Sequence, residues 1–174
     1  KALRGEPEVT LARERLELPD GDFIERDFGT APTPDAPIGL VLHGLEGSSR
    51  RGYARVAYIE LLRRGIRPIG MNFRSCSGEP NRTARFYHSG ETEDLLFVIE
   101  HLAARFPSVP MGAIGFSLGG NVLLKFLGEQ MEAAREWLTA AVAISVPYDL
   151  LSGSRRLGSG LMGRAYSEYF LRML

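Results

Sequence analysis

The sequence predicts an α/β fold, a mostly parallel sheet covered by helices, with an antiparallel hairpin at its start. Short apolar runs alternate along the chain with segments whose apolar residues recur at helical spacing, which is typical of a parallel sheet. Residues 14–28 read differently, as two short strands around a Pro-Asp-Gly turn. The chain has 174 residues, 44% of them apolar, which is enough for one domain with a substantial core.

The elements after the hairpin follow a regular β-α-β-α-β-α-β order. A Pro-rich surface loop is expected at 30–37. The expected strands are 38–44, 66–73, 111–116 and 140–146, and the expected helices are 53–65, 90–106, 118–128 and 131–138. Ser89 precedes a helix with acidic residues near its start, so we expect its hydroxyl to cap that helix. In such an alternation the helices cover both faces of the sheet.

Composition narrows the range of functions. Lys plus Arg and Asp plus Glu are 21 each, and this zero net charge predicts no general attraction to nucleic acid or to an anionic membrane. Cys76 is the only cysteine, which excludes an internal disulfide and indicates a reducing, cytoplasmic location. No apolar run reaches the length of a transmembrane helix. No zinc-type spacing and no glycine motif of the nucleotide-binding kind occurs, so neither a metal nor a cofactor is expected.

Residues 115–119 read GFSLG and match the G-x-S-x-G pattern of a nucleophile elbow. The serine, Ser117, lies between a predicted strand and a predicted helix, as that turn requires. The turn is sharp, so Gly115 and Gly119 meet a need for small residues, and we expect Ser117 to have a positive φ. The alternative is an ordinary serine in a glycine-rich turn that holds a phosphate.

A second motif, His43-Gly44-Leu45, ends an earlier strand. In an α/β-hydrolase this loop supplies one backbone donor to the oxyanion hole, here the N–H of Leu45, and the residue after the nucleophile, here Leu118, supplies the other. Two preset donors stabilise the charge of a tetrahedral intermediate, each by roughly 3 kcal/mol. We expect the His43 ring to orient the loop and not to transfer protons, because a general base must reach the serine from the other side of the site.

These motifs and their surroundings resemble the α/β-hydrolase superfamily and, within it, the YheT-like group of predicted hydrolases. The matching stretches are LVLHGLEGSS (40–49), MNFRSCSGEPNR (71–82), YHSGETEDL (87–95), GFSLGGNVLLKFLG (115–128) and VAISVPYDL (142–150). One departure is Ser75, where members of the group usually have glycine. The resemblance implies a serine esterase that works through an acyl-enzyme, and it leaves acyl transfer to an alcohol open.

The resemblance also implies the chain order Ser, then Asp or Glu, then His. All the histidines of this chain precede Ser117: they are His43, His88 and His101. We expect structural or surface roles for the last two. Asp149 follows the serine, but members of the family place their acid later. We therefore expect the triad acid and histidine outside residues 1–174, with residues 1–150 forming the N-terminal part of a hydrolase core whose sheet is incomplete at the C-terminus.

Residues 151–174 differ in character from the rest. Apolar and aromatic residues of this stretch share one helical face: Tyr166, Tyr169, Phe170 and Met173. We interpret the stretch as the start of a lid or cap over the acyl pocket. The alternatives are a helix packed against other parts of the domain and, third, a helix on a membrane surface.

The loop after the strand at 66–73 carries the cysteine and several charges. Cys76 has no histidine at a catalytic spacing, so we expect a buried or half-buried thiol without a catalytic role. The charged residues Arg74, Glu79 and Arg82 could pin this loop by ion pairs or lie in solvent.

The function predicted from the sequence is hydrolysis of a carboxylic ester of a small molecule or lipid. Ser117 is the expected nucleophile, and the amides of Leu45 and Leu118 are the expected oxyanion donors. Two alternatives stay open: an acyltransferase that uses the same site, and a hydrolase-fold scaffold without catalysis.

Overall fold

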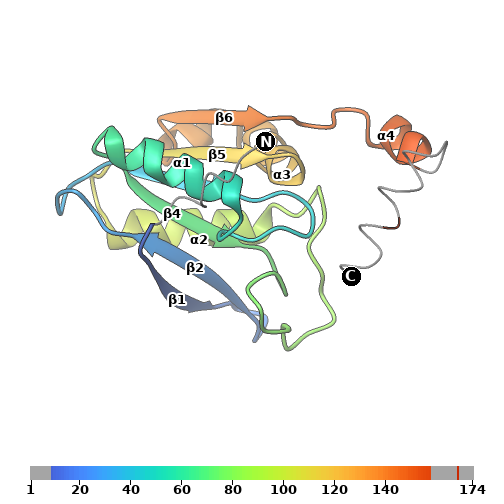
Figure 1. The fold of residues 1–174 in the computed structure, drawn as a ribbon, viewed down its shortest axis with the longest axis horizontal. Helices are drawn as coiled ribbons and strands as arrows, with labels where there is room; N and C mark the ends of the chain where they lie inside the picture. The colour runs from blue at the N-terminus through green and yellow to red at the C-terminus, as the bar shows by residue number, and fades with distance from the viewer. Residues whose placement is uncertain (1–8, 158–167, 169–174) are drawn as a thin grey trace, which may run out of the picture.

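One six-stranded sheet forms the centre of the computed structural model, which describes residues 9–157 and 168. Its strands are β1 (Leu11–Glu17), β2 (Phe23–Gly29), β3 (Ile38–Leu42), β4 (Arg67–Asn72), β5 (Met111–Phe116) and β6 (Ala140–Ile144). They lie in the order β1-β2-β4-β3-β5-β6 (Figure 1). The β1–β2 and β2–β4 pairs are antiparallel and the other three pairs are parallel. The predicted mostly parallel sheet with an antiparallel hairpin at its start is confirmed.

Helices cover both faces of the sheet, as predicted. The helices are α1 (Gly52–Arg63), α2 (Glu93–Arg105), α3 (Leu118–Gln130) and α4 (Leu150–Leu157), with a 3-10 helix η1 (Met131–Glu136). Side chains of α1 pack with Val41 on one face, and those of α2 and α3 pack with Leu40 and Leu42 on the other. This alternation along β3 buries the central strand on both sides.

The expected capping of α2 by Ser89 is wrong. The helix begins at Glu93, and its N-cap residue is Thr92, whose side chain makes no capping hydrogen bond. The residues before it form a separate turn in which the Glu91 N–H donates to the His88 carbonyl at 3.0 Å. Since this turn occupies residues 88–91, Ser89 lies too early in the chain to reach the first amides of the helix.

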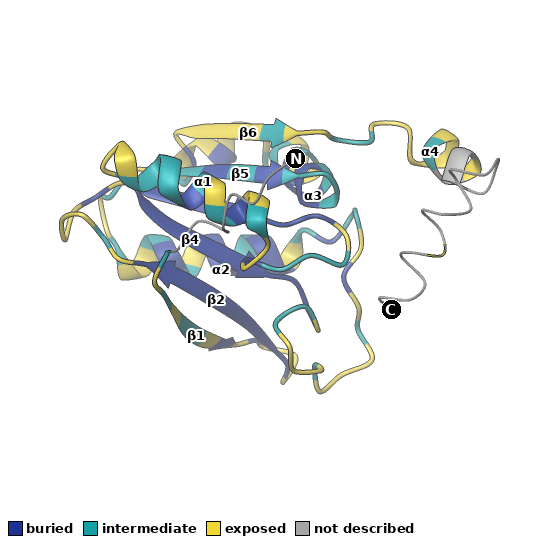
Figure 2. Ribbon diagram, viewed as in Figure 1, coloured by how far each residue is buried: buried dark blue, intermediate teal, exposed yellow. Residues whose placement is uncertain are grey.

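The strand β6 is an edge of the sheet in the part of the chain that the structure describes. Val142 is 51% exposed and Ile144 is 38% exposed, whereas β2 and β4 are buried along their whole length (Figure 2). Beyond β6, α4 stands apart from the sheet (Figure 1). The aromatic face that we assigned to a lid, Tyr166, Tyr169, Phe170 and Met173, lies outside the described residues.

Ion pairs hold the loop after β4, which is the first of the two alternatives expected from the sequence. The Arg74 guanidinium is buried and donates to both oxygens of Asp94 at 2.7 Å and to Asp22 at 3.1 Å. It thereby joins the hairpin turn, the loop and α2. The other two charges of the loop, Glu79 and Arg82, form exposed pairs with residues of β1, Arg15 and Glu17.

Candidate active site

Ser117 lies at the turn between β5 and α3 and has the strained backbone that the motif predicts. Its φ is 50° and its ψ is −114°, and a non-glycine residue in such a conformation costs about 1–3 kcal/mol. The turn is held from two sides: the Ser117 N–H donates to the Ile144 carbonyl of β6 at 2.9 Å, and its carbonyl accepts from the Asn121 N–H at 3.1 Å. Among the described residues, no group is hydrogen bonded to the Ser117 hydroxyl.

The glycines around Ser117 have no room for a side chain. A Cβ at Gly115 would lie 2.5 Å from the Gly119 carbonyl oxygen. A Cβ at Gly119 would lie 2.5 Å from the His43 carbonyl oxygen and 2.7 Å from that of Leu42. These contacts are with backbone atoms, which cannot rotate away. The first turn of α3 therefore packs directly against the end of β3, as the need for small residues predicts.

The loop after β3 lies beside the turn that carries Ser117. A Cβ at Gly44 would be 3.3 Å from the Ser117 Cβ and 3.5 Å from the Phe116 carbonyl oxygen. The two motifs, far apart along the chain, thus meet because β3 and β5 are parallel neighbours whose carboxyl ends lie at one edge of the sheet.

Three of the four amide groups in residues 44–47 are already engaged. The Gly44 N–H donates to the Tyr53 hydroxyl and the Glu46 N–H donates to the Tyr87 hydroxyl, both at 2.9 Å. The Gly47 N–H donates to the Gly44 carbonyl at 3.0 Å. The Leu45 N–H has no partner among the described residues. The same holds for the N–H of Leu118, which opens α3. Free amides are what an incoming oxyanion needs.

The His43 ring is fully buried, and both its nitrogens are hydrogen bonded to backbone groups. The Phe73 N–H donates to Nε2 at 3.1 Å, so Nε2 is unprotonated and the proton lies on Nδ1, which donates to the Gly44 carbonyl at 2.7 Å. Burial lowers the pKa of His43 to about 4. This neutral ring orients the loop and has no free nitrogen with which to accept a proton.

The two other histidines lie elsewhere, one in the turn before α2 and one within that helix. His88 is exposed, and its Nδ1 accepts the Gly90 N–H at 3.0 Å. His101 lies within α2 and is partly buried; burial, with help from the nearby charges of Arg26 and Arg105, lowers its pKa. No hydrogen bond joins any histidine of the chain to Ser117 within the described residues.

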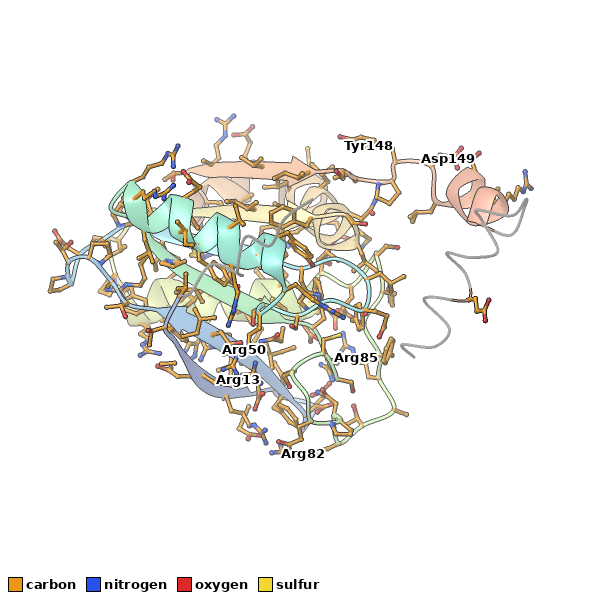
Figure 3. All side chains as sticks on the ribbon, in the orientation of Figure 1. Arg13, Arg50, Arg82, Arg85, Tyr148 and Asp149 are labelled. Carbon is orange, nitrogen blue, oxygen red and sulfur yellow. The ribbon has the colours of Figure 1, made fainter. Side chains whose placement is uncertain are left out.

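Asp149 has a local structural role at the start of α4. Its Oδ1 accepts the Ser152 N–H at 2.9 Å, and this hydrogen bond lowers the pKa of the carboxyl group. Figure 3 shows Asp149 and Tyr148 on the segment that leads from β6 out to α4. The exposed carboxylate is thus a helix cap, consistent with the view that it is not the acid of a triad.

The loop after β4 contributes a thiol and a second strained serine beside the 44–47 loop. Cys76 is half-buried, and burial raises the pKa of its thiol to about 11, so it is not a reactive thiolate. Ser75 has φ 62°, a conformation that glycine adopts without strain. In this chain the Ser75 Oγ compensates by accepting the Asn81 N–H at 3.1 Å.

A cavity of about 370 Å³ opens next to this loop. Its walls include Glu46 and Cys76 and three basic residues, Arg13, Arg50 and Arg51, of which Figure 3 labels the first two. The guanidinium groups of Arg13 and Arg50 are both paired with the buried carboxylate of Asp27.

Across residues 9–157 and 168, no group of three or more His, Cys, Asp or Glu side chains is placed to hold a metal ion, and no helix has the length and apolar character to cross a bilayer.

Tyr53 and Tyr87 hold the 44–47 loop, and neither stands in a sequence motif that indicates this role. Tyr53 is 9 positions from its partner and Tyr87 is 41. No short motif links residues at such separations, so only the tertiary structure could show that the two hydroxyls meet one loop.

The chain is similar to proteins that are named as an esterase and a phospholipase, although no family model matches it. It is 39% identical over 176 residues to "Putative esterase YheT" of Escherichia coli (strain K12), covering 100% of this chain and 51% of that protein. It is 31% identical over 180 residues to phospholipase ABHD3 of Homo sapiens, covering 99% of this chain and 43% of that protein. The chain thus spans about half the length, or less, of these relatives.

Solved structures share the fold. XC6422 from Xanthomonas campestris, described as an α/β serine hydrolase without a lid, matches with a TM-score of 0.65 at 28% identity. The match covers 80% of this chain and 62% of that one. The strand order and the turn at Ser117 agree with these similarities. The chain belongs to the α/β-hydrolase superfamily, as its resemblance to the YheT-like group implied.

Proposed function

We propose that the protein is a serine hydrolase that cleaves carboxylic esters through an acyl-enzyme, with Ser117 as the nucleophile. The observation that carries this proposal is the meeting of the strained Ser117 turn with a loop in which only the Leu45 amide is left free. The names of the relatives, an esterase and a phospholipase, support an ester as the substrate class.

The proposed chemistry follows from these groups. The Ser117 Oγ attacks the carbonyl carbon of the ester as a base removes its proton, and the amides of Leu45 and Leu118 donate to the oxyanion that forms. The tetrahedral intermediate collapses, the alcohol leaves with a proton returned by the same base, and the acyl group stays on Oγ. Water then attacks the acyl-enzyme by the same sequence and releases the carboxylic acid.

We propose that the base and its acid come from outside residues 1–174. Three observations on the histidines support this: His43 has no free nitrogen, and neither His88 nor His101 is hydrogen bonded to Ser117 within the described residues. In keeping with this, we propose that residues 1–150 are the N-terminal part of a hydrolase core and that 151–174 begin its lid or cap. A small-molecule or lipid ester is the proposed ligand.

A fluorophosphonate probe tests the nucleophile, because the probe forms a tetrahedral adduct that occupies an oxyanion hole. Mass spectrometry of the labelled full-length protein should place the adduct on Ser117, and Ser117→Ala should abolish it. Ser145→Ala is the matched control, since Ser145 also has a positive φ, 55°, and follows the neighbouring strand. Labelling should persist in that variant. A folded, unlabelled wild-type protein would refute the proposal and favour a non-catalytic scaffold.

A second measurement separates hydrolysis from acyl transfer. The enzyme, not treated with the probe, is incubated with an aryl ester in the presence and absence of a short-chain alcohol, and the products are identified. Free acid as the main product in both cases supports hydrolysis. Formation of a new ester in preference to the acid would identify an acyltransferase on the same site.

A further inference from the structure

We infer that the hydroxyl groups of Tyr53 and Tyr87 set the position of the Leu45 amide, so that both tyrosines are positioning residues for the proposed oxyanion hole. The inference rests on the proposed function. Neither tyrosine touches the reacting atoms in this scheme. Each acts on a peptide unit next to the one that carries the free N–H.

The direction of the Leu45 N–H depends on the peptide plane that it shares with the Gly44 carbonyl, because the two groups point to opposite sides of a planar trans peptide. That carbonyl accepts from His43 Nδ1 at 2.7 Å and from the Gly47 N–H at 3.0 Å. The plane is therefore held from its carbonyl side, and the N–H is directed away from the loop.

Tyr53 holds the peptide unit before this plane. Its hydroxyl oxygen accepts the Gly44 N–H at 2.9 Å, and a Cβ at Gly47 would lie only 2.7 Å from the same oxygen. The hydroxyl thus lies within the curve of the loop. The ring packs on Phe116 with centroids 4.8 Å apart, directly before Ser117. One side chain from α1 therefore contacts both the loop and the turn that carries the nucleophile.

Tyr87 holds the peptide unit after this plane. Its hydroxyl accepts the Glu46 N–H and donates to Glu46 Oε1, both at 2.9 Å, which ties down a residue whose φ is 50°. The ring is buried and stacks on Phe73 with centroids 5.3 Å apart and planes 4° from parallel. Burial, with the nearby Cys76 thiol, raises the pKa of Tyr87, so the phenol keeps the proton that it donates.

The side chain of Leu45 offers no anchor of its own, since it is 43% exposed. The position of its amide therefore depends on the residues on either side, Gly44 and Glu46, and each is held by one phenol hydroxyl. Removing a hydroxyl leaves the ring packing in place but leaves the Gly44 or Glu46 amide without its acceptor. The loop can then move until that amide finds another acceptor. A donor misplaced by a fraction of an ångström stabilises the transition state less while leaving substrate binding intact.

The test compares Tyr53→Phe and Tyr87→Phe with Tyr58→Phe in the full-length protein, using hydrolysis of a short-chain aryl ester. Tyr58 is the matched control: it lies on the same helix as Tyr53 and is buried, and its hydroxyl donates to the Ser49 carbonyl at 2.7 Å, outside residues 43–47. We expect the first two variants to lose roughly 10- to 100-fold in kcat with KM changed by less than about 3-fold. The control should keep kcat within about 2-fold of wild type, whatever its stability.

Fluorophosphonate labelling of the wild type distinguishes failure of the positioning role from failure of the proposed function. If Ser117 is labelled and both Phe variants keep the wild-type kcat, the positioning role is refuted and the proposed function stands. If Tyr58→Phe loses kcat as much as they do, the effect is a general loss of packing and the inference fails. If the folded wild type is not labelled, the proposed function falls and this inference with it. Should Tyr87→Phe not fold, Tyr53→Phe decides the question alone, because Tyr53 is 40% exposed and lies at the edge of the core.

Discussion

Substitution of Gly119 by alanine tests the close approach of α3 to β3 that brings the two motifs together. The new Cβ would lie 2.5 Å from the His43 carbonyl oxygen and 2.7 Å from that of Leu42. Ordinary contacts between such atoms are about 3.5 Å, so the start of the helix would have to move by roughly 1 Å. Neither oxygen belongs to a side chain that could rotate away.

Gly128→Ala is the matched variant in the same helix, since a Cβ there meets nothing within 4 Å. Alanine gains about 0.5–1 kcal/mol over glycine inside a helix, so Gly128→Ala should stabilise the protein by about that amount. The same gain largely cancels when the two variants are compared. Their difference in free energy of unfolding therefore reports the clash at residue 119, and we expect about 1–3 kcal/mol, with Gly119→Ala the less stable.

The assay is urea denaturation of both variants and the wild type, read as midpoints at a common m-value. Fluorophosphonate labelling at Ser117 should also slow in Gly119→Ala, because movement of α3 carries the serine away from the loop after β3. Equal stability of the two variants, together with unchanged labelling, would show that α3 does not pack against the end of β3 as described.

Two further predictions concern buried charge. Replacing Arg74 by methionine leaves the carboxylates of Asp22 and Asp94 buried without their cation and should cost about 3–5 kcal/mol in urea denaturation. Arg82→Met, at an exposed pair, should leave the urea midpoint nearly unchanged, and similar losses in the two variants would contradict this reasoning. The pKa of His43 is lowered to about 4 in the folded chain. As the pH falls below about 6.5, the unfolded chain therefore takes up a proton at this residue that the folded chain does not. The free energy of unfolding should be unaffected by His43 above that pH and should decrease by up to about 3 kcal/mol by pH 4. Imidazole NMR at pH 5.5 should still show a neutral His43 ring with its proton on Nδ1, and a charged ring at that pH would refute the assignment.

Much of the framework could be predicted from local pattern. Alternation of apolar runs with helical spacing indicated the β-α-β succession, and the Pro-Asp-Gly turn indicated the hairpin. The spacing of glycine around Ser117 predicted its positive φ, which the structure confirms. These features are visible in the sequence because each depends on residues a few positions apart, within one turn or one element.

Errors arose where a local pattern competed with another local hydrogen bond. Ser89 has the residue type and nearby acids of a helix cap, yet the turn closed by the His88 carbonyl moves the start of α2 to Glu93. The boundary was therefore decided by which of two short-range turns the chain adopts, and residue types alone do not rank such alternatives.

The tertiary structure alone decided which groups satisfy one another across the sheet. Asp27 lies on a strand that reads as half polar, yet it is fully buried because Arg13, Ser49 and Asn72 reach its carboxylate from separations of 14, 22 and 45 residues. The amides on either side of the free Leu45 N–H are held in the same way, by hydroxyls from α1 and from the loop before α2. Sequence patterns of period two or 3.6 record which side of an element faces inward. The group that a side chain contacts on that side depends on strand order and on how closely distant segments approach. A hydrogen bond is made or lost within a few tenths of an ångström of that approach.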